Sequence, residues 1–369
     1  MRVAFAFSHR YPETVGGAQR YYWALTRELA RQAAVTYLTA GAWDGPRVQD
    51  GVDVVAVSRG PAPRSYAAGL AAHLTRQGGR YDVVHCACFP PFAPAAALGA
   101  LRAHRQVPLV VDWHEVLRRE RWRRLWPGLG GDARWVAQQT AVRGATASVV
   151  FSALHERRLR AAGARDVVRL DEFLPDRAPD PAAIGGSRER LLVFAGRLVE
   201  EKRADLVAPV LAALRAQDPS WRAVVFGDGP QRGRLESAAL RAGVGDAVRF
   251  AGFAPWPEVS AALLRASALL APSEREGFGL VVLEAAAHGL PAVLVAGPDN
   301  AATELIAEGV NGTVCARADA GELAAAVRRV AVPGAPALAR GWFDARSRTA
   351  DVAAVAQRHR ELHERLLRR

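Results

Sequence analysis

Two cations in the stretch AGRLVEEKRAD, residues 195–205, are placed to bind an anion. Arg197 and Lys202 follow the apolar run LLVFAG and precede a segment with helical periodicity, so both lie near a predicted helix start, where free N–H groups favour negative charge. Lys202 is the only lysine among 49 basic residues, and an ammonium is not interchangeable with a guanidinium. The pattern predicts a diphosphate-binding site, with two solvated surface cations as the alternative.

Two carboxylates in SEREGFGLVVLEAAAHGLP, residues 273–291, could contact hydroxyl groups of one ligand. Glu276 lies in a predicted loop and Glu284 about two turns into the following helix, so they would address different parts of an elongated molecule. Gly277 and Gly279 free the backbone to present N–H groups to an anion. Glu284 stands inside an apolar run, where a buried carboxylate needs a partner. The alternative makes Glu276 a helix-dipole partner and Glu284 a solvated helix residue.

Short Val-rich runs alternate with helix-like segments in the first half of the chain and predict a doubly wound α/β domain. Continuous apolar runs without polar alternation are typical of parallel strands that are covered on both faces. Ligands of such sheets bind at the carboxyl ends of the strands. The predicted strands are VAFAF (3–7), VTYL (35–38), VDVVAV (52–57), YDVVHC (81–86), VPLVVD (107–112) and ASVVF (147–151).

A break rich in Pro, Gly and charge separates this series from a second one. It predicts a linker at 173–188 between a domain at 1–172 and another at 189–343. Residues 344–369 have a charged helical pattern, which we interpret as a solvated closing helix that could pack back on the first domain. The strands of the second series are LLVFAG (191–196), WRAVVFG (221–227), AVRFAG (247–252), ASALLAP (267–272) and PAVLV (291–295).

Composition restricts the partners. The formal net charge of +12 favours an anionic partner, but no nucleic-acid-binding motif accompanies it, so no nucleic acid is expected.

Three cysteines, at 86, 88 and 315, are too few for a disulfide framework and predict buried free thiols. No run reaches the roughly 18 apolar residues of a membrane span, and the first residues resemble a strand rather than a signal peptide. We therefore expect a cytoplasmic protein.

Five motifs of the second half, in their order and spacing, resemble those of glycosyltransferase family four, the glycosyltransferase group 1 type, whose members are retaining enzymes of the GT-B fold. The motifs are AGRLVEEK, VFGDGP, VRFAGF, PSEREGFGLVVLEAAAHGLPAV and EGVNG. The resemblance implies two Rossmann-like doubly wound domains that face a cleft. The chain departs from the family at LDEFLPD (170–176), where many relatives have Asn-Gly-Val-Asp, and at AGPDNAATE (296–304), where relatives more often show a glycine beside the glutamate.

The resemblance also implies roles for the residues singled out above. Arg197 and Lys202 would hold the donor diphosphate and stabilise the charge that develops on the departing nucleotide. Glu284 would bind the ribose hydroxyls. The donor sugar and phosphate would be contacted by Glu276 and by backbone N–H groups of Gly277, Phe278 and Gly279.

In the first half, the family resemblance points to two further places. Gly16 and Gly17, in TVGGAQRYYWAL, lie where the family has a glycine-rich loop that faces the donor phosphates and the acceptor. His114, in VVDWHE, follows the fifth predicted strand, where members often carry a histidine near the reacting sugar. A single histidine at a strand end is equally compatible with a structural role. His9 and Glu13 are additional candidates on the acceptor side.

The segment VLRRERWRRLWPGLGGDARW, residues 116–135, is rich in Arg and Trp. Both residue types suit an anionic membrane interface, which would make the segment a peripheral contact at the inner face of the membrane. The alternative, which we favour, is a helix that packs its tryptophans on the core and solvates its arginines. Under the first interpretation, substitution of Arg121, Arg123 and Arg124 would reduce binding to liposomes.

The sequence thus predicts transfer of a sugar from a nucleotide-sugar donor, with a UDP-sugar favoured, to a hydroxyl acceptor with retention of configuration. Cell-envelope lipids, polysaccharides and specialised metabolites are candidate acceptors. No Asp-x-Asp occurs, so we expect catalysis without a metal or cofactor. A nucleotide-sugar epimerase or hydrolase of the same fold is one alternative, since fold does not fix the reaction. A non-catalytic protein that binds polyanions or membranes is the other.

Overall fold

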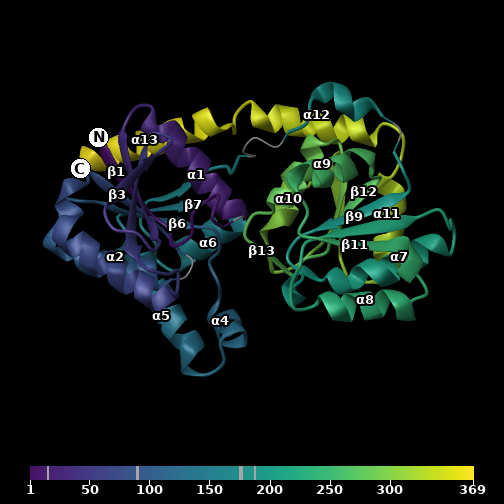
Figure 1. The fold of residues 1–369 in the computed structure, drawn as a ribbon, viewed down its shortest axis with the longest axis horizontal. Coiled ribbons are helices and arrows are strands. Elements are labelled where there is room, and N and C mark those ends of the chain that lie inside the picture. Colours follow the sequence, from purple (N-terminus) through teal and green to yellow (C-terminus); the bar gives the residue numbers. More distant parts are fainter. Residues whose placement is uncertain (15, 89–90, 174–177, 187) are drawn as a thin grey trace. The chain divides into compact units, whose positions relative to one another are not determined.

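The chain forms two compact units, each with its own sheet. The computed structural model describes residues 1–14, 16–88, 91–173, 178–186 and 188–369. The first unit comprises Met1–Pro175 and Ala350–Arg369, and the second comprises Asp176–Thr349 (Figure 1). Of the predicted linker at 173–188, positions 174–177 and 187 lie outside the described residues, whereas Pro181–Gly185 form a short 3₁₀ turn.

The first unit is built on an eight-stranded sheet in the order β3-β4-β2-β1-β5-β6-β7-β8. Every pair is parallel except β3 with β4. The order reverses direction between the adjacent strands β1 and β5, which is where a doubly wound sheet opens to a ligand. The strands are β1 (Arg2–Ala6), β2 (Ala34–Ala40), β3 (Pro46–Gln49), β4 (Val52–Ser58), β5 (Val83–Ala87), β6 (Leu109–Trp113), β7 (Ala147–Val150) and β8 (Val167–Arg169).

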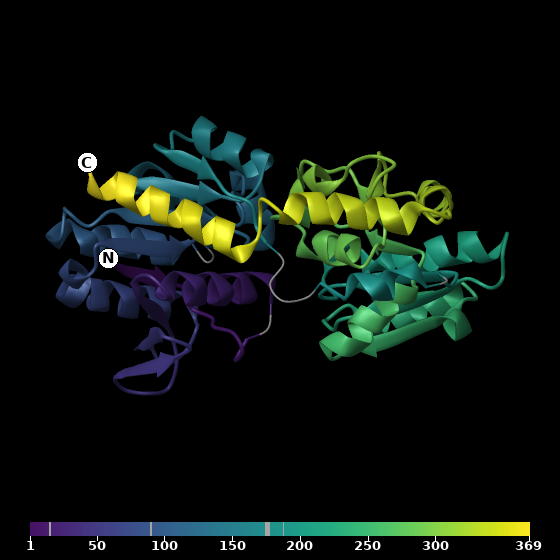
Figure 2. The same cartoon turned by 90° about the horizontal axis from the view of Figure 1, so that it is seen from above.

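Helices cover both faces of this sheet. On one face, α2, α3 and α5 pack over a core that includes Leu70, Ala97 and Val142. On the other face, α1 packs against the C-terminal helix α13 (Figure 2). The helices are α1 (Gly17–Ala30), α2 (Pro63–Gln77), α3 (Phe92–Ala100), α4 (Arg119–Leu125), α5 (Leu129–Gly144), α6 (Ala153–Ala161) and α13 (Val352–Leu367).

The second unit has a six-stranded, entirely parallel sheet in the order β11-β10-β9-β12-β14-β16. Its reversal lies between β9 and β12. The strands are β9 (Leu191–Ala195), β10 (Arg222–Phe226), β11 (Val248–Gly252), β12 (Ala268–Ala271), β14 (Ala292–Val295) and β16 (Gly312–Cys315); a separate short pair consists of β13 (Arg275–Glu276) and β15 (Asp299–Asn300).

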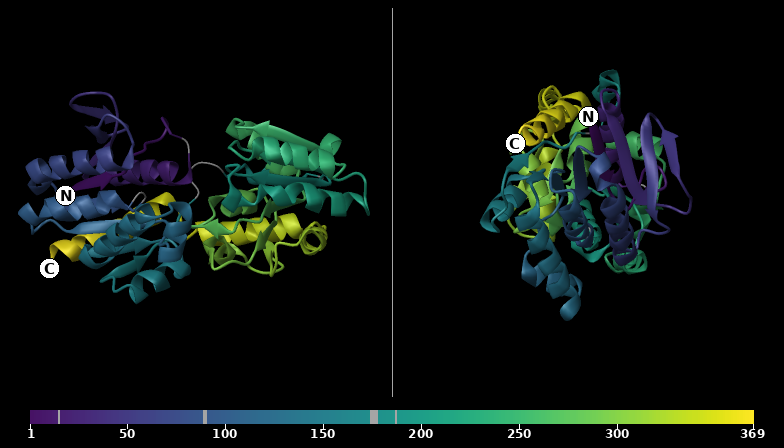
Figure 3. Two further views of the ribbon diagram at one scale, coloured as in Figure 1. Left: turned by 90° about the horizontal axis from the view of Figure 1, so that it is seen from below. Right: turned by 90° about the vertical axis from the view of Figure 1, so that its left-hand side faces the viewer.

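Helices cover this second sheet on both faces as well (Figure 3). One side carries α7, α8 and α11, which bury Leu211, Leu235 and Leu323 in the core of the unit. The helices of the unit are α7 (Val207–Arg215), α8 (Arg232–Arg241), α9 (Trp256–Arg265), α10 (Leu280–Ala287), α11 (Ala320–Val330) and α12 (Ala335–Ser347). Two Rossmann-like α/β units confirm the predicted fold class.

The elements that the sequence did not predict are short or exposed. β3 is an edge strand of sequence PRVQ with mostly exposed side chains, and β16 contains only four residues, so neither has an extended apolar run. The single helix expected at 344–369 is two helices, because α12 ends at Ser347 and Asp351 caps α13 by accepting from the Ala354 N–H at 2.7 Å. α13 is solvated on one face only; it buries the other face and contacts α1 of the first unit.

The described helices include none with the length and hydropathy that a membrane crossing requires. All three cysteines are buried free thiols, as predicted.

His288, at the end of α10, is buried in a neutral form. Its Nδ1–H donates to the Glu284 carbonyl at 2.6 Å, which leaves Nε2 to accept from the Ser260 hydroxyl at 2.8 Å. Burial lowers the pKa of His288 to about 4, and the nearby cations Arg188 and Arg340 act in the same direction. The native unit therefore excludes a proton that the unfolded chain would bind.

We expect acid to destabilise the second unit through this histidine. Between pH 6.5 and about 4 the unfolded chain binds a proton at His288 that the native state does not, so stability falls as pH is lowered, by at most about 3 kcal/mol. Calorimetric midpoints at several pH values should fall less steeply for His288→Gln than for the unchanged protein. Parallel pH profiles for the two proteins would contradict this assignment.

Candidate functional site

The predicted cations of the second unit lie where its sheet reverses direction. Arg197 and Lys202 follow β9, and the loop Ser273–Gly279 follows β12, the adjacent strand. Both segments therefore leave the carboxyl edge of the sheet at its centre, the position at which open α/β sheets bind ligands. Arg197 is exposed, and Lys202 closes a 3₁₀ turn formed by Glu200–Lys202.

Close backbone packing fixes the segment that carries these cations. The N–H groups of Gly196 and Leu198 donate to Phe226 and Asp228 carbonyls at 3.0 and 2.9 Å, so the loops after β9 and β10 are joined. Gly227 has a φ of 116°, and a Cβ at this position would lie 1.9 Å from the Gly196 carbonyl oxygen. Only glycine permits this approach, which explains the first glycine of the VFGDGP motif, Gly227.

Lys202 and Glu276 form an ion pair, although 74 positions separate them in sequence. Lys202 Nζ lies 2.5 Å from Glu276 Oε1, and the side chains are 20% and 14% exposed. The Ser273 hydroxyl donates to the same oxygen at 2.9 Å. One carboxylate oxygen thus accepts two hydrogen bonds, and the ammonium is held at the sheet edge in a position that remains accessible to an incoming anion.

A second ion pair, between Arg275 and Glu201, also links the loops that follow β9 and β12. Arg275 Nη2 donates to Glu201 Oε1 at 2.7 Å, and the Glu274 N–H donates to the Glu201 carbonyl at 2.9 Å. Burial of Glu201 opposes its ionisation, but backbone hydrogen bonding and Arg275 outweigh this and lower its pKa. Glu201 and Arg275 directly precede Lys202 and Glu276 in sequence. Their ion pair therefore holds the two loops together and fixes the separation of Lys202 and Glu276.

Asn300 is a positioning residue that the sequence analysis missed. Its amide Nδ2 donates to the Ser273 and Val295 carbonyls, both at 2.9 Å, while Glu276 is paired with Asn300 in the β13–β15 ladder. The composition could have pointed to this residue, because the chain contains only two asparagines, Asn300 and Asn311. Asn311 makes similar buried contacts, to the Leu305 carbonyl at 2.8 Å and the Ala307 N–H at 2.7 Å.

The GFG turn after Glu276 forms the start of α10. Gly279 is the N-cap residue with a φ of 104°, and no side chain caps the helix, so its first N–H groups point out of the helix end. Phe278 is buried. Glu284 lies partly buried in α10, the helix that follows this turn.

We expect Gly279→Ala to weaken donor binding and to destabilise the second unit by about 1–3 kcal/mol. Alanine at position 279 would have a strained φ, and its Cβ would lie 2.5 Å from the Ala302 Cβ. Gly233→Ala in α8 is the matched control, since its Cβ would meet no atom within 4 Å and alanine favours helix. Thermal midpoints and nucleotide titrations of both variants provide the check; equal behaviour of the two would refute a requirement for glycine at 279.

In the first unit, the candidates lie around the reversal between β1 and β5. Gly16 is the extended N-cap of α1, Gly17 is its first residue, and no side chain caps this helix either. His9 follows β1; its Nδ1 lies 2.9 Å from the Ser8 hydroxyl, and burial lowers its pKa. Glu13 forms an ion pair with Arg10 through its Oε1, and its side chain is 52% exposed.

His114 directly follows β6 and is oriented by a carboxylate. Its Nδ1 lies 3.0 Å from Oε1 of the buried Glu172, and its ring stacks on Phe151 with centroids 4.8 Å apart. Tyr22 of α1 packs edge-on against the ring at 5.3 Å. Nε2 is buried and has no hydrogen-bond partner among the described residues. A proton on Nδ1, donated to Glu172, leaves the lone pair of Nε2 without a partner among the described residues.

Glu172 is the second positioning residue that the sequence analysis missed. It lies in LDEFLPD, the segment that departs from the family pattern, and 58 positions separate it from His114. No local pattern relates the two residues. Only the arrangement of the strands brings them together.

The Arg- and Trp-rich segment forms α4 and α5. Trp122 is buried and donates its indole N–H to Gln138 Oε1 at 3.0 Å, while Arg119 and Arg123 both pair with Asp132. Arg134 stacks on Trp126 at 4.3 Å. These contacts agree with the packing interpretation, although Leu129 at the start of α5 is 87% exposed.

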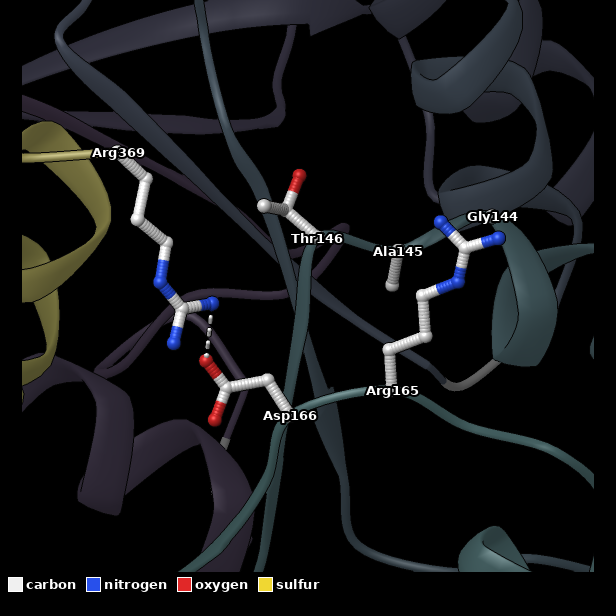
Figure 4. A pocket seen from close by; sticks show the side chains of 6 residues that line it. All are labelled: Gly144, Ala145, Thr146, Arg165, Asp166 and Arg369. Atoms are coloured by element: carbon white, nitrogen blue, oxygen red, sulfur yellow. Dashed lines mark hydrogen bonds and ion pairs between the residues drawn. The ribbon is translucent and has the colours of Figure 1, made fainter.

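One surface pocket lies apart from all these residues (Figure 4). Arg369 reaches across it to Asp166 with an Nη1–Oδ2 distance of 3.0 Å. Thr146 and Asp166 immediately precede β7 and β8, so the pocket lies at the amino edge of the first sheet, opposite the strand ends that carry His114. We assign it no role in the site.

Comparison with known proteins agrees with this geometry. Residues 180–331 match the model of the family Glycosyl transferases group 1, and residues 16–170 match that of the Glycosyl transferase 4-like domain. The chain is 30% identical, over 365 residues, to the GDP-mannose-dependent alpha-(1-6)-phosphatidylinositol monomannoside mannosyltransferase of Mycolicibacterium smegmatis; the match covers 88% of this chain and 90% of that protein. Other relatives match over only part of their length: the matched segments cover 18% of an exopolysaccharide phosphotransferase of Streptomyces coelicolor and 33% of a glycogen synthase of Mycobacterium tuberculosis.

Solved structures share the fold. A sucrose-phosphate synthase from Thermosynechococcus elongatus superposes with a TM-score of 0.80 at 19% identity, covering 99% of this chain and 98% of that one. Alr3699/HepE of Anabaena in complex with UDP has a TM-score of 0.75 at 22% identity, covering 98% of this chain and 99% of that one.

Proposed function

The chain belongs to the glycosyl transferases group 1 family and is a GT-B glycosyltransferase, and from this premise we propose that it transfers a sugar from a nucleotide-diphosphate donor to a hydroxyl acceptor with retention of configuration. The observation that carries the proposal is the ion pair of Lys202 with Glu276 at the reversal of the second sheet. It couples a cation suited to phosphate with a carboxylate suited to sugar hydroxyls.

Lys202 and Arg197 act on the leaving group. As the bond between the anomeric carbon and the phosphate oxygen breaks, negative charge accumulates on the diphosphate, and cations stabilise it more strongly than they do the intact donor. In the structure the carboxylate of Glu276 neutralises the ammonium of Lys202. The donor diphosphate displaces part of this interaction, and Glu276 then contacts a sugar hydroxyl.

The first N–H groups of α10, beyond Gly279, offer a neutral anion site beside the cations. Glu284, further along the same helix, binds the ribose hydroxyls. The acceptor oxygen attacks on the face that the phosphate leaves, and its proton passes to the departing phosphate. The two cations supply the charge that a metal provides in other transferases, so we propose that the reaction proceeds without one.

His114 serves the acceptor side of the reaction. Glu172 accepts a hydrogen bond from its Nδ1–H, and the unpartnered Nε2 accepts a hydrogen bond from a sugar hydroxyl. Gly16 and Gly17, at the uncapped start of α1, offer backbone N–H groups to the donor phosphates or the acceptor.

Two comparisons support our choice of donor class, for which the sequence analysis favoured a UDP-sugar. The structure of Alr3699/HepE, which shares the fold, is a complex with UDP. The relative that matches along nearly the whole chain is named for GDP-mannose and for a phosphatidylinositol mannoside acceptor. We therefore place UDP-sugars and GDP-mannose first among donors and a cell-envelope glycolipid first among acceptors, with the reaction in the cytoplasm at the inner face of the membrane.

Nucleotide release from a panel of UDP-, GDP-, ADP- and dTDP-sugars, measured in the presence of chelator, tests the proposal. We expect slow release from one donor, accelerated by an added glycolipid acceptor. Turnover that no acceptor changes would instead identify an epimerase or hydrolase. Absence of both binding and turnover with every donor, together with a steep salt dependence of liposome or polyanion binding, would favour the non-catalytic alternative.

A further inference from the structure

Three histidines of the first unit converge inside the protein. His85 lies on β5, and His359 and His363 lie one turn apart on α13, so 278 positions separate His85 from His363. All three side chains are at most 1% exposed. A ligating atom of each lies within 4.8 Å of those of the other two. No other group of three metal-binding side chains with such spacing occurs among the described residues.

The hydrogen bonding of these imidazoles is incomplete. Both ring nitrogens of His359 and Nδ1 of His363 are buried without a partner in the described part of the chain. The Nε2 atoms of His85 and His363 lie 2.6 Å apart, so at least one of them needs a proton to avoid opposed lone pairs. Burying unpaired polar atoms costs free energy, and proteins therefore rarely accumulate them in one place without a function.

A buried carboxylate completes the cluster. Both oxygens of Asp112, on β6, lie 3.1 Å from Nδ1 of His85. In the tautomer whose Nδ1–H donates to this carboxylate, the lone pair of Nε2 points toward His363. The carboxylate–histidine arrangement is the one that orients metal ligands in proteins, and it places negative charge where a cation would compensate it.

We propose that His85, His359 and His363 bind one divalent transition-metal ion of the zinc class, with Asp112 as the outer carboxylate. Imidazole nitrogens suit zinc, which prefers three or four such ligands at about 2.0–2.1 Å. Tetrahedral bonding at that length separates ligand nitrogens by roughly 3.3 Å. On binding, the two rings whose Nε2 atoms now lie 2.6 Å apart move outward, whereas ligating atoms that lie as much as 4.8 Å apart move closer together.

The ion would fasten α13 to the central sheet. His359 and His363 project from one face of the helix, as residues at i and i+4 do, and that face is the buried one. Phe5 of β1 stacks on His85 at 4.5 Å and limits the motion of its ring. The site lies inside the first unit, so its role is to hold the fold; it is independent of the metal-free reaction proposed above.

Metal content and metal titration test this site directly. The protein is purified without a metal-affinity tag, stripped with a chelator, and titrated with Zn²⁺ and with Co²⁺. We expect one ion per chain, visible absorption bands of a tetrahedral Co²⁺–imidazole complex, and a rise of several degrees in the melting temperature with excess Zn²⁺. A chain that stays folded and binds neither ion would overturn the proposal.

Two variants and a matched control localise the site. His359→Gln and His363→Gln should each lose the Co²⁺ bands and the Zn²⁺-dependent rise in melting temperature. His73→Gln should keep both, because His73 is also buried in the first unit but its Nε2 contacts the Tyr81 hydroxyl at 2.9 Å, away from the cluster. Retention of the bands by both cluster variants would refute the assignment, and circular dichroism confirms that each variant is folded. If a variant unfolds, the titration of the unchanged protein still decides.

Discussion

Lys202→Ala is expected to lower kcat by about 10²- to 10³-fold, the range found when one group that stabilises developing negative charge is removed. The ammonium opposes the charge of the departing diphosphate, whereas it contacts the intact donor more weakly. The loss should therefore fall mainly on kcat, with a smaller change in KM. Initial rates of nucleotide release with the donor found in the panel provide the measurement.

Two controls separate charge from geometry at this position. Lys202→Arg should recover only part of the activity, because a guanidinium is larger and bonds through a planar fork. Arg203→Ala removes the neighbouring cation, which pairs with Asp205 at the surface, and should leave the rate nearly unchanged. An equal loss of kcat in Lys202→Ala and Arg203→Ala would indicate that positive charge in this region acts at a distance, rather than through a contact of Lys202 with the donor.

The single lysine permits a chemical version of the same test. An amine-specific reagent can modify only Lys202 and the α-amino group of this sequence. We expect inactivation to follow modification of Lys202 and donor to protect against it. Full activity after complete modification of Lys202 would exclude a role for its charge.

Glu276→Gln is expected to lower kcat by roughly 10- to 100-fold, which corresponds to one hydrogen bond to a charged group. The amide keeps the shape of the side chain but releases Lys202 from its counter-ion. Affinity for the nucleotide diphosphate product should consequently not weaken, since the phosphate no longer competes with the carboxylate. Calorimetric titration with UDP and GDP, alongside initial rates, measures both effects.

Glu274→Gln is the matched control for this substitution. Glu274 lies on the same loop, two positions earlier, and is exposed. We expect nearly unchanged rate and affinity. The opposite pattern for Glu276→Gln, an unaltered kcat with weakened product binding, would assign Glu276 to the diphosphate rather than to the sugar.

The sequence by itself determined the class of fold and the segments that carry the chemistry. Buried parallel strands need continuous apolar runs, so LLVFAG and VPLVVD marked β9 and β6 to within two residues. The GFG turn was also recognisable in the sequence, because an N-cap residue with a left-handed backbone conformation is usually glycine. In a composition that almost excludes lysine, the position of Lys202 was itself informative.

Only the tertiary structure decided which of these side chains meet. Lys202 contacts Glu276 because β9 and β12 are neighbours, and Glu172 reaches His114 through the order of β6, β7 and β8. The edge strand β3 was likewise not predicted from the sequence, since its pairing with β4 creates it. Periodicity reports the local environment of a residue, whereas a contact between His85 and His363 depends on how every intervening element is placed.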